Sequence, residues 1–296
     1  MSRTAKNAVV LVTGAASGMG LLYAQRAARE GAKAVVLWDV NADALAAAAA
    51  GLTADFPRVA ISTEAVDITS QTGIEAAATS VLAGVGVPDI LINNAGIVRG
   101  KWFWEHDPAG DIDATIAVNT VAPMQITRAF LPAMMADASR PRRILNIASA
   151  AGLFSTPRMA VYAASKSGLI GWSDSLRLEL RGQGYAHVAV TTVMPSFVST
   201  GMFAGAKAPL ITPILTPETV VDRVWVRMLA GRARVILPGS VYIAVGLRGV
   251  LGVAPFDWIA DNLLRIYGSM SDFTGRVGEA VDEAVDKAVD SAVDKS

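Results

Sequence analysis

Residues 8–20 read Ala-Val-Val-Leu-Val-Thr13-Gly14-Ala-Ala-Ser17-Gly18-Met19-Gly20, a short apolar run that leads into a glycine-rich turn. A helical pattern follows in residues 21–30. A strand, a glycine turn and a helix in this order form a dinucleotide-binding fingerprint, because the glycines let the backbone approach a pyrophosphate. The start of the helix would offer that anion free N–H groups and the positive end of the helix dipole. This stretch therefore predicts a parallel α/β fold with a nucleotide site at its first turn.

The second apolar strand indicates which dinucleotide is bound. It spans residues 34–38 and ends at Asp39. An acidic side chain at this strand end can hydrogen-bond both ribose hydroxyls, and it repels a 2′-phosphate. No Arg or Lys lies in residues 13–20 or 39–50. We therefore expect NAD(H), with NADP(H) less favoured. The alternative is that Asp39 is a surface aspartate that caps the next helix.

Three further residues predict the chemistry. Tyr162 and Lys166 are four positions apart, so they share one face of a helix. A phenol has a pKa of about 10 and is a poor base at neutral pH, and a nearby ammonium lowers that pKa. Ser149, brought close from a strand end, can hold the oxygen of the reacting carbon. Together they can move a proton on and off an alcohol oxygen, while a dinucleotide takes or gives the hydride.

These motifs together resemble the classical short-chain dehydrogenase/reductase family, over residues 6–237. The family's glycine motif is matched by Thr13, Gly14, Gly18 and Gly20. Its Asn-Asn-Ala-Gly motif is matched by Asn93, Asn94, Ala95 and Gly96. Its catalytic tetrad is matched by Asn119, Ser149, Tyr162 and Lys166. The resemblance implies that Asp67 and Ile68 contact the adenine, and that Pro195 and Thr200 flank the nicotinamide carboxamide. The cofactor-binding residues expected in all are Gly14, Ser17, Gly18, Met19, Gly20, Asp39, Asp67, Ile68, Asn94, Ala95, Gly96, Tyr162, Lys166, Pro195, Val198 and Thr200.

The resemblance also implies a role for each tetrad residue. Tyr162 would be the general base in alcohol oxidation and the general acid in carbonyl reduction. Lys166 would lower the pKa of Tyr162 and bind the nicotinamide ribose. Asn119 would kink its helix and order a water molecule. One position departs from the family, since Ser196 stands where a glycine usually follows Pro195, and it adds a side chain near the nicotinamide.

Strand and helix patterns alternate through the chain, which predicts a doubly wound Rossmann-type α/β fold with a parallel sheet of about seven strands in the order 3-2-1-4-5-6-7. Ligands bind beyond the carboxyl ends of such strands. We expect a catalytic domain at 1–237, a helical extension at 238–276 and a low-complexity tail at 277–296. The expected strands are 8–13, 34–39, 59–64, 89–93, 142–148, 187–193 and 234–237, and the expected helices are 18–30, 41–55, 70–84, 110–136, 160–182 and 217–230.

Composition excludes several classes of function. The chain of 296 residues has no cysteine and two histidines, which argues against thiolate chemistry and against a metal site. Lys plus Arg and Asp plus Glu both number 26, so nucleic-acid binding has no electrostatic footprint. The fingerprint strand begins almost at once and no N-terminal signal is visible, so we expect a cytoplasmic protein. The resemblance implies a homodimer or homotetramer.

The substrate is predicted only as a class. Three segments, 97–105, 150–159 and 196–215, follow strand ends and would line the site. Apolar pockets with a few polar anchors are typical of specific small-molecule sites, so we expect a hydrophobic secondary alcohol or its ketone. Arg99, Lys101 and Arg158 could meet an anionic group, although solvated surface charge is the simpler interpretation. The apolar side chains in these segments are Trp102, Phe103, Trp104, Leu153, Phe154, Met159, Phe197, Met202 and Phe203.

The extension contains an amphipathic pattern after Pro255, with Phe256, Ile259, Ala260, Leu263 and Ile266 at helical spacing. It could cover the pocket, dock on a neighbouring subunit or make a peripheral membrane contact through residues 238–270. The apolar run 241–254 is too short and interrupted to span a membrane. The tail repeats Ala-Val-Asp with a period of four, which predicts a frayed helix or disorder.

Three functions remain open from the sequence. The first is an NAD-dependent dehydrogenase of a hydrophobic alcohol. The second is an NADH-linked carbonyl or 3-oxoacyl reductase, since the direction of flow depends on cofactor ratios. The third is a catalytically silent dinucleotide sensor, against which the intact set of Asn119, Ser149, Tyr162 and Lys166 counts strongly.

Overall fold

The computed structural model describes residues 4–209 and 212–275, and it has a sheet of seven parallel strands at its centre. The strand order is β3-β2-β1-β4-β5-β6-β7, as the alternating pattern predicted. Each strand lies within a residue or two of its predicted position. The strands are β1 (Val9–Thr13), β2 (Ala34–Asp39), β3 (Ala60–Ala65), β4 (Ile90–Asn93), β5 (Arg142–Ile147), β6 (Val188–Pro195) and β7 (Arg234–Leu237).

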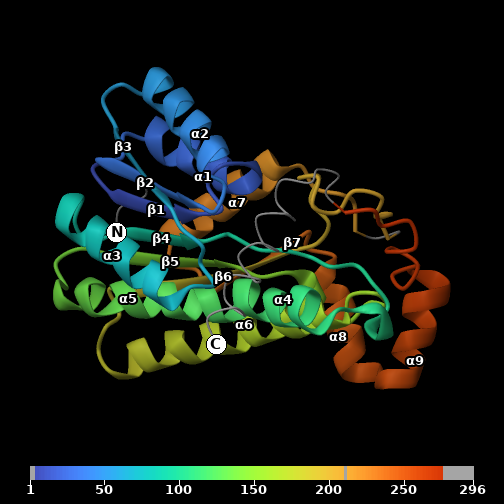
Figure 1. Ribbon diagram of the computed structural model, residues 1–296. Coiled ribbons are helices and arrows are strands. Elements are labelled where there is room, and N and C mark those ends of the chain that lie inside the picture. Colours follow the sequence, from blue (N-terminus) through green and yellow to red (C-terminus); the bar gives the residue numbers. More distant parts are fainter. Residues whose placement is uncertain (1–3, 210–211, 276–296) are drawn as a thin grey trace.

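Helices cover both faces of the sheet (Figure 1). One face carries α1, α2 and α7, whose apolar side chains pack against one side of the strands. The other face carries α3, α5 and α6. Burial on both faces explains why the inner strands β1 and β2 are apolar runs rather than alternating patterns. The bounds are α1 (Gly18–Arg29), α2 (Ala42–Asp55), α3 (Gln71–Gly84), α4 (Ala114–Ile116), α5 (Ala122–Ala136), α6 (Ala160–Gly182), α7 (Pro217–Leu229), α8 (Val241–Leu251) and α9 (Val253–Trp258).

The single helix predicted at 110–136 is wrong in detail. The segment begins with a π-helical turn at Pro108–Asp113, and a second π-helical turn at Ala117–Val121 separates α4 from α5. An extra residue per turn changes which side chains face the sheet, and such turns occur frequently at functional sites. The second π-helical turn contains Asn119, whose side chain is fully buried. The distortion that the family resemblance assigned to Asn119 is therefore present in this chain.

The extension packs on the catalytic core. Phe256, Ala260 and Ile266 are buried in one apolar cluster with Phe154 and Ile236. The amphipathic pattern thus docks onto protein, although Leu263, predicted on the same face, is exposed. The helix begins at Val253 rather than at Pro255, and it ends in a π-helical turn at Ile259–Leu263. The predicted boundaries at 237 and 276 stay predictions, and the tail at 277–296 lies outside the described residues. No helix in the described part of the chain is long and apolar enough to cross a membrane.

Candidate active site

The glycine turn after β1 is held in a conformation that needs glycine. Gly14 and Gly18 have φ angles of +63° and +55°, which other residues rarely adopt. A Cβ on Gly14 would lie 2.9 Å from the Cα of Ala95, and one on Gly20 would lie 2.0 Å from the carbonyl oxygen of Gly14. The start of α1 therefore packs directly against the turn, with no room for a side chain at Gly14 or Gly20. A helix N-terminus placed at such a turn can bind an anion through its free N–H groups.

A hydrogen-bonded clamp fixes this turn to the neighbouring strand. The backbone N–H groups of Asn94 and Ala95 both donate to the hydroxyl of Thr13, at 3.0 and 3.1 Å. The Asn94 amide donates to the carbonyl oxygens of Thr13 (3.0 Å) and Gly14 (3.3 Å). The two motifs that the sequence placed at the ends of β1 and β4 are thereby joined. Their residues work as one rigid platform.

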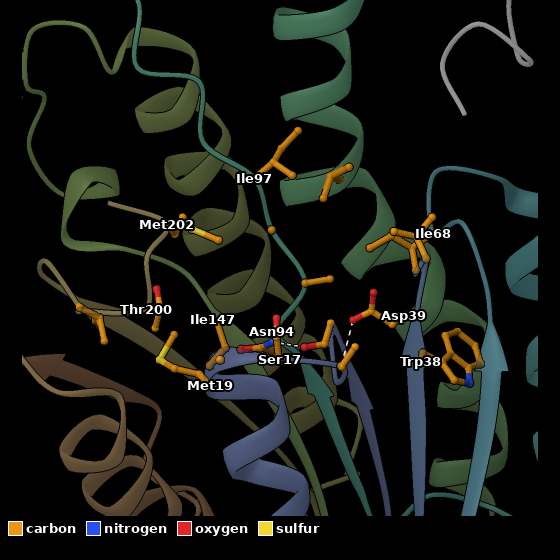
Figure 2. A pocket seen from close by; sticks show the side chains of 18 of the residues that line it. Ser17, Met19, Trp38, Asp39, Ile68, Asn94, Ile97, Ile147, Thr200 and Met202 are labelled. Carbon is orange, nitrogen blue, oxygen red and sulfur yellow. Dashed lines mark hydrogen bonds between the residues drawn. The ribbon is translucent and has the colours of Figure 1, made fainter. Parts of the chain in front are cut away.

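Asp39 closes the far end of the cavity, beside Ile68 and Trp38 (Figure 2). One carboxylate oxygen accepts from the backbone N–H of Ala16 at 3.0 Å, and the other from that of Asn41 at 3.1 Å. The carboxylate is therefore fixed at the strand end. The hypothesis that Asp39 only caps the following helix is wrong, because the side chain of Asn41 caps it by accepting from Ala44.

A single cavity of about 360 Å³ connects Asp39 with Ser149, Tyr162 and Lys166. Every cofactor-binding residue that the sequence predicted lines it except Gly20, which supports the turn from behind. Thr200 and Met202 lie at the opposite end from Asp39 (Figure 2). Ile97, in the predicted segment 97–105, also lines the cavity. The lining residues that sequence reasoning missed lie in or shortly after the same strands, except Ala44 on α2 and Val118 in the π-helical turn before α5. They are Ala16, Trp38, Val40, Asn41, Ala44, Val66, Thr69, Val118, Ile147 and Ala148.

Ser149, Tyr162 and Lys166 all line this cavity and are buried. Ser149 follows β5, where its hydroxyl accepts from the N–H of Ala151 at 3.1 Å, and it also hydrogen-bonds Tyr162. Lys166 lies below Tyr162 on α6, with its Nζ 5.7 Å from the centre of the phenol ring. The Nζ donates to the carbonyl oxygen of Ile147 at 3.0 Å. A phenol, a hydroxyl and an ammonium thus share one enclosed space.

Asn119 does not line the cavity. Its Oδ1 accepts from the N–H of Ile97 at 2.9 Å, and its Nδ2 donates to the Ile97 carbonyl (2.9 Å) and to the Ser165 hydroxyl (3.1 Å). These bonds tie the segment after β4 to α6, one residue before Lys166. Asn119 is therefore a positioning residue that sets how the platform at Ala95 and Gly96 meets the lysine.

Burial controls the ionisation of the two catalytic candidates. It raises the pKa of Tyr162 to about 12, partly opposed by the hydrogen bond with Ser149. Burial also lowers the pKa of Lys166 to about 8. Lys166 was expected to lower the pKa of Tyr162, but in the protein alone that pKa is raised. Removing the phenolate from water costs more free energy than the nearby ammonium restores. A positive charge brought into the cavity would oppose this effect.

The buried lysine predicts a stability cost that depends on pH. The pKa of Lys166 in the folded protein is about 8, whereas that of a lysine exposed to water is 10.5. Stability is therefore lowest below pH 8 and recovers as pH rises to the ordinary lysine range. Lys166→Met is expected to raise the free energy of unfolding at neutral pH by up to about 3 kcal/mol, less about 1 kcal/mol for the unpaired Ile147 carbonyl. Urea unfolding at neutral pH and again above the ordinary lysine pKa measures both values.

The control for this substitution is Lys33→Met, at an exposed side chain. It should change stability little at either pH. Two outcomes would contradict the prediction. The Lys166→Met protein could be less stable than the wild type at neutral pH, or it could be stabilised by the same amount at neutral pH and above the ordinary lysine pKa. Either would show that burial of the lysine charge does not lower the stability of the wild type.

A second, smaller pocket of about 40 Å³ begins at Ser149 and Ser196 and extends under the C-terminal extension. Four of the nine predicted apolar residues line it, namely Phe154, Met159, Phe197 and Phe203. Met202 lines the cofactor cavity instead, Leu153 packs in the core beneath α8, and the aromatic residues 102–104 are exposed. Thr156, Pro209 and Thr212 also line the second pocket, from the predicted segments 150–159 and 196–215. The residues outside those segments that complete the pocket come from the extension and are Ala244, Ile266, Ser269 and Met270.

The three cations considered as anion ligands have partners within the protein. Lys101 and Arg99 lie 2.7 and 3.5 Å from the buried carboxylate of Asp111. Arg158 donates to the carbonyl oxygens of Met270 and Ser271, at 3.2 and 3.0 Å. Arg158 therefore fastens the extension over the site. It is not a solvated surface charge.

The comparison with protein families supports the same conclusion. The model described as "short chain dehydrogenase" matches residues 8–210. Epidermal retinol dehydrogenase 2 of Mus musculus is 34% identical over 270 residues, covering 90% of this chain and 85% of that protein. Estradiol 17-beta-dehydrogenase 11 of Pongo abelii is 36% identical over 247 residues, covering 82% of this chain and 79% of that protein.

Solved structures share the fold. A short-chain dehydrogenase/reductase from Burkholderia phymatum in complex with NAD has a TM-score of 0.74 and 27% identity, over 84% of this chain and 95% of that one. A metagenomic short-chain oxidoreductase in complex with NADP has a TM-score of 0.66 and 32% identity, over 80% and 98%. Both cofactors therefore occur among the neighbours. The chain belongs to the short-chain dehydrogenase family, and it is an oxidoreductase that acts on CH–OH groups.

Proposed function

We propose that this protein interconverts a hydrophobic secondary alcohol and its ketone with NAD(H), using Tyr162 as the general acid and base. The observation that carries the proposal is one continuous cavity, lined both by the fixed carboxylate of Asp39 and by buried Ser149, Tyr162 and Lys166. The complete set counts against a silent sensor, which has no need of an enclosed proton donor. NADH-linked carbonyl reduction is the reverse of the same reaction and uses the same residues.

The residues divide the chemistry between them. When bound, the nicotinamide accepts or donates the hydride. The hydroxyl of Ser149 holds the substrate oxygen, and the phenolate of Tyr162 removes the proton from that oxygen as the hydride leaves the carbon. In reduction the neutral phenol returns the proton. Lys166 is positioned to bind the ribose and to favour the phenolate, while Asn119 keeps the lysine and the Gly96 segment in register.

The apolar pocket supports a hydrophobic substrate. Phenylalanine and methionine side chains line the space beside Ser149, and the polar lining groups are uncharged hydroxyls. The relatives named above are a retinol dehydrogenase and an estradiol dehydrogenase, so their names also refer to apolar alcohols. The test is the absorbance of reduced nicotinamide with purified protein, NAD and a panel of apolar secondary alcohols, with retinol and estradiol included. The proposal would be contradicted if the protein bound NAD tightly but oxidised no alcohol of the panel.

The choice of NAD rests on Asp39. Its fixed carboxylate repels a 2′-phosphate, and Lys166 is the only basic residue among those that line the cavity in the described part of the chain. Asp39→Ala is expected to shift the ratio of kcat/KM for NADP over NAD upward by about tenfold or more, since a like-charge contact costs several kcal/mol. Asp43→Ala, which removes an exposed carboxylate on α2 outside the cavity, is the control. An unchanged ratio in the Asp39 variant would leave NADP as an equal candidate.

A further inference from the structure

The extension presents an apolar surface to solvent on the side away from the core. On α8, Val241 and Ala244 are buried in the apolar cluster that anchors the helix. Tyr242, Ile243 and Val250 are exposed, with 85% of Val250 accessible. At 100° per residue these three lie on the face opposite the anchored one. The exposed face is therefore separate from the surface that docks α8 on the protein.

The connection between α8 and α9 continues this surface. Residues 249–255 read Gly-Val-Leu-Gly-Val-Ala-Pro, carry no charge and are all exposed. Val253 is 72% accessible, and Trp258, five residues further along α9, is 60% accessible. Contiguous apolar surface of this kind is uncommon on soluble monomers and marks an interaction site. We define the apolar hairpin as Tyr242, Ile243, Val250, Val253 and Trp258.

A basic recess adjoins the first residue of the apolar hairpin. Four arginines, Arg223, Arg227, Arg232 and Arg234, line a recess of about 420 Å³ between α7, β7 and Tyr242. Arg234 pairs with Asp174, whereas the other three have no ion pair among the described residues. No acidic side chain lines this recess in the described part of the chain. We call these four residues the arginine recess.

We propose that the apolar hairpin and the arginine recess together bind an anionic lipid surface, with α8 lying flat on it. In this orientation the aliphatic residues at 250 and 253 enter the acyl boundary, while Trp258 and Tyr242 lie at headgroup level. The arginine recess then faces lipid phosphates, which guanidinium groups bind well. An amphipathic face joined to basic residues is the pattern of interfacial binding, which needs no spanning helix.

Charge decides between a lipid surface and a second copy of the chain. A two-fold contact through the edge strand β7 would bring the arginine recess of one copy against that of the other. The unpaired guanidinium groups would then repel across the contact. A lipid surface with phosphate groups satisfies both the basic recess and the apolar hairpin. The arrangement thus favours lipid as the occupant.

Vesicle sedimentation tests the proposal without any substrate. Full-length protein is centrifuged with vesicles of phosphatidylcholine alone and of phosphatidylcholine mixed with phosphatidylglycerol. The wild type should sediment with the mixed vesicles. The pair Val250→Glu with Val253→Glu should weaken that binding at least about tenfold. The pair Arg223→Gln with Arg227→Gln should weaken it about fivefold for each arginine, and only when phosphatidylglycerol is present.

Matched controls carry the same chemistry to other exposed sites. Leu178→Glu on α6 and the pair Arg128→Gln with Arg181→Gln, on α5 and α6, should leave sedimentation unchanged. Thermal unfolding midpoints confirm that all variants are folded, since each altered side chain is exposed. The proposal is overturned if the wild-type protein stays in the supernatant with both kinds of vesicle. In that case a second copy of the chain, or its own C-terminal residues, would cover the apolar hairpin instead of lipid. The proposal is also overturned if the Val250→Glu, Val253→Glu variant changes the oligomeric state in gel filtration but still sediments with the mixed vesicles as the wild type does.

Discussion

Tyr162→Phe is expected to lower kcat for alcohol oxidation by about 10³-fold, within the range that a positioned acid or base contributes. The substitution removes one oxygen and keeps the buried ring, so the fit against Phe203 on the neighbouring segment is retained. The glycine turn and Asp39 are untouched, so dinucleotide affinity should stay near that of the wild type. A loss confined to kcat is what separates a proton-transfer role from a structural one.

The pH profile adds a second readout for the same residue. Oxidation needs the phenolate, and burial raises the pKa of Tyr162 to about 12 in the protein alone. The wild-type oxidation rate should therefore rise with pH through the neutral and alkaline range. Reduction uses the neutral phenol and should stay flat over that range. The residual activity of Tyr162→Phe should lose the rise in oxidation.

Tyr23→Phe is the matched control. Tyr23 is also fully buried, stacks on Trp225, and has no hydrogen-bond partner for its hydroxyl among the described residues. Removing that hydroxyl should leave turnover unchanged and stability equal or higher. If the Tyr162→Phe enzyme binds NAD and turns over at the wild-type rate, Tyr162 is not the general acid and base.

The sequence predicted the parts of the site that lie in local motifs at strand ends. The turn at Gly14, the carboxylate of Asp39 and the pair of Tyr162 and Lys166 each depend on a few neighbouring residues. Because a parallel sheet gathers its carboxyl ends at one edge, the strand order alone brings these motifs together. That is why nearly every cofactor-binding residue predicted from the motifs lines the cavity.

The substrate pocket could not be predicted in the same way. It is closed by Ala244, Ile266 and Met270, which come from a segment whose path over the core depends on long-range packing. No spacing in the sequence indicates that Arg158 fastens this segment by donating to two carbonyl oxygens. Aromatic residues at 102–104 looked equally suitable for the pocket, yet they are exposed.

The direction of the Tyr162 pKa shift was missed for a related reason. The sequence shows the ammonium of Lys166 one turn away, but it does not show how deeply both groups are buried. Desolvation is a property of the whole fold, and here it exceeds the effect of the neighbouring charge. Local pattern predicts which groups meet, whereas burial decides how they ionise.

Gly20→Ala is expected to weaken dinucleotide binding by about 100-fold or more and to lower the unfolding midpoint. The new Cβ would lie 2.0 Å from the backbone carbonyl oxygen of Gly14 and 2.7 Å from the side-chain amide nitrogen of Asn94. The first of these is backbone, so α1 must move away from the turn. That movement separates the helix N-terminus from the cradle on which pyrophosphate binding depends. Calorimetric titration with NAD and a thermal unfolding scan measure the two effects.

Gly51→Ala provides the opposite expectation from the same chemical change. Gly51 also lies in a helix, α2, but a Cβ there would meet nothing within 4 Å. Alanine should therefore stabilise this helix by about 0.5–1 kcal/mol and leave NAD affinity unchanged. The contrast isolates the close approach at Gly20 from the general preference of helices for alanine. Equal NAD affinity in the two variants would mean that the contact between α1 and the turn does not hold the cofactor cradle.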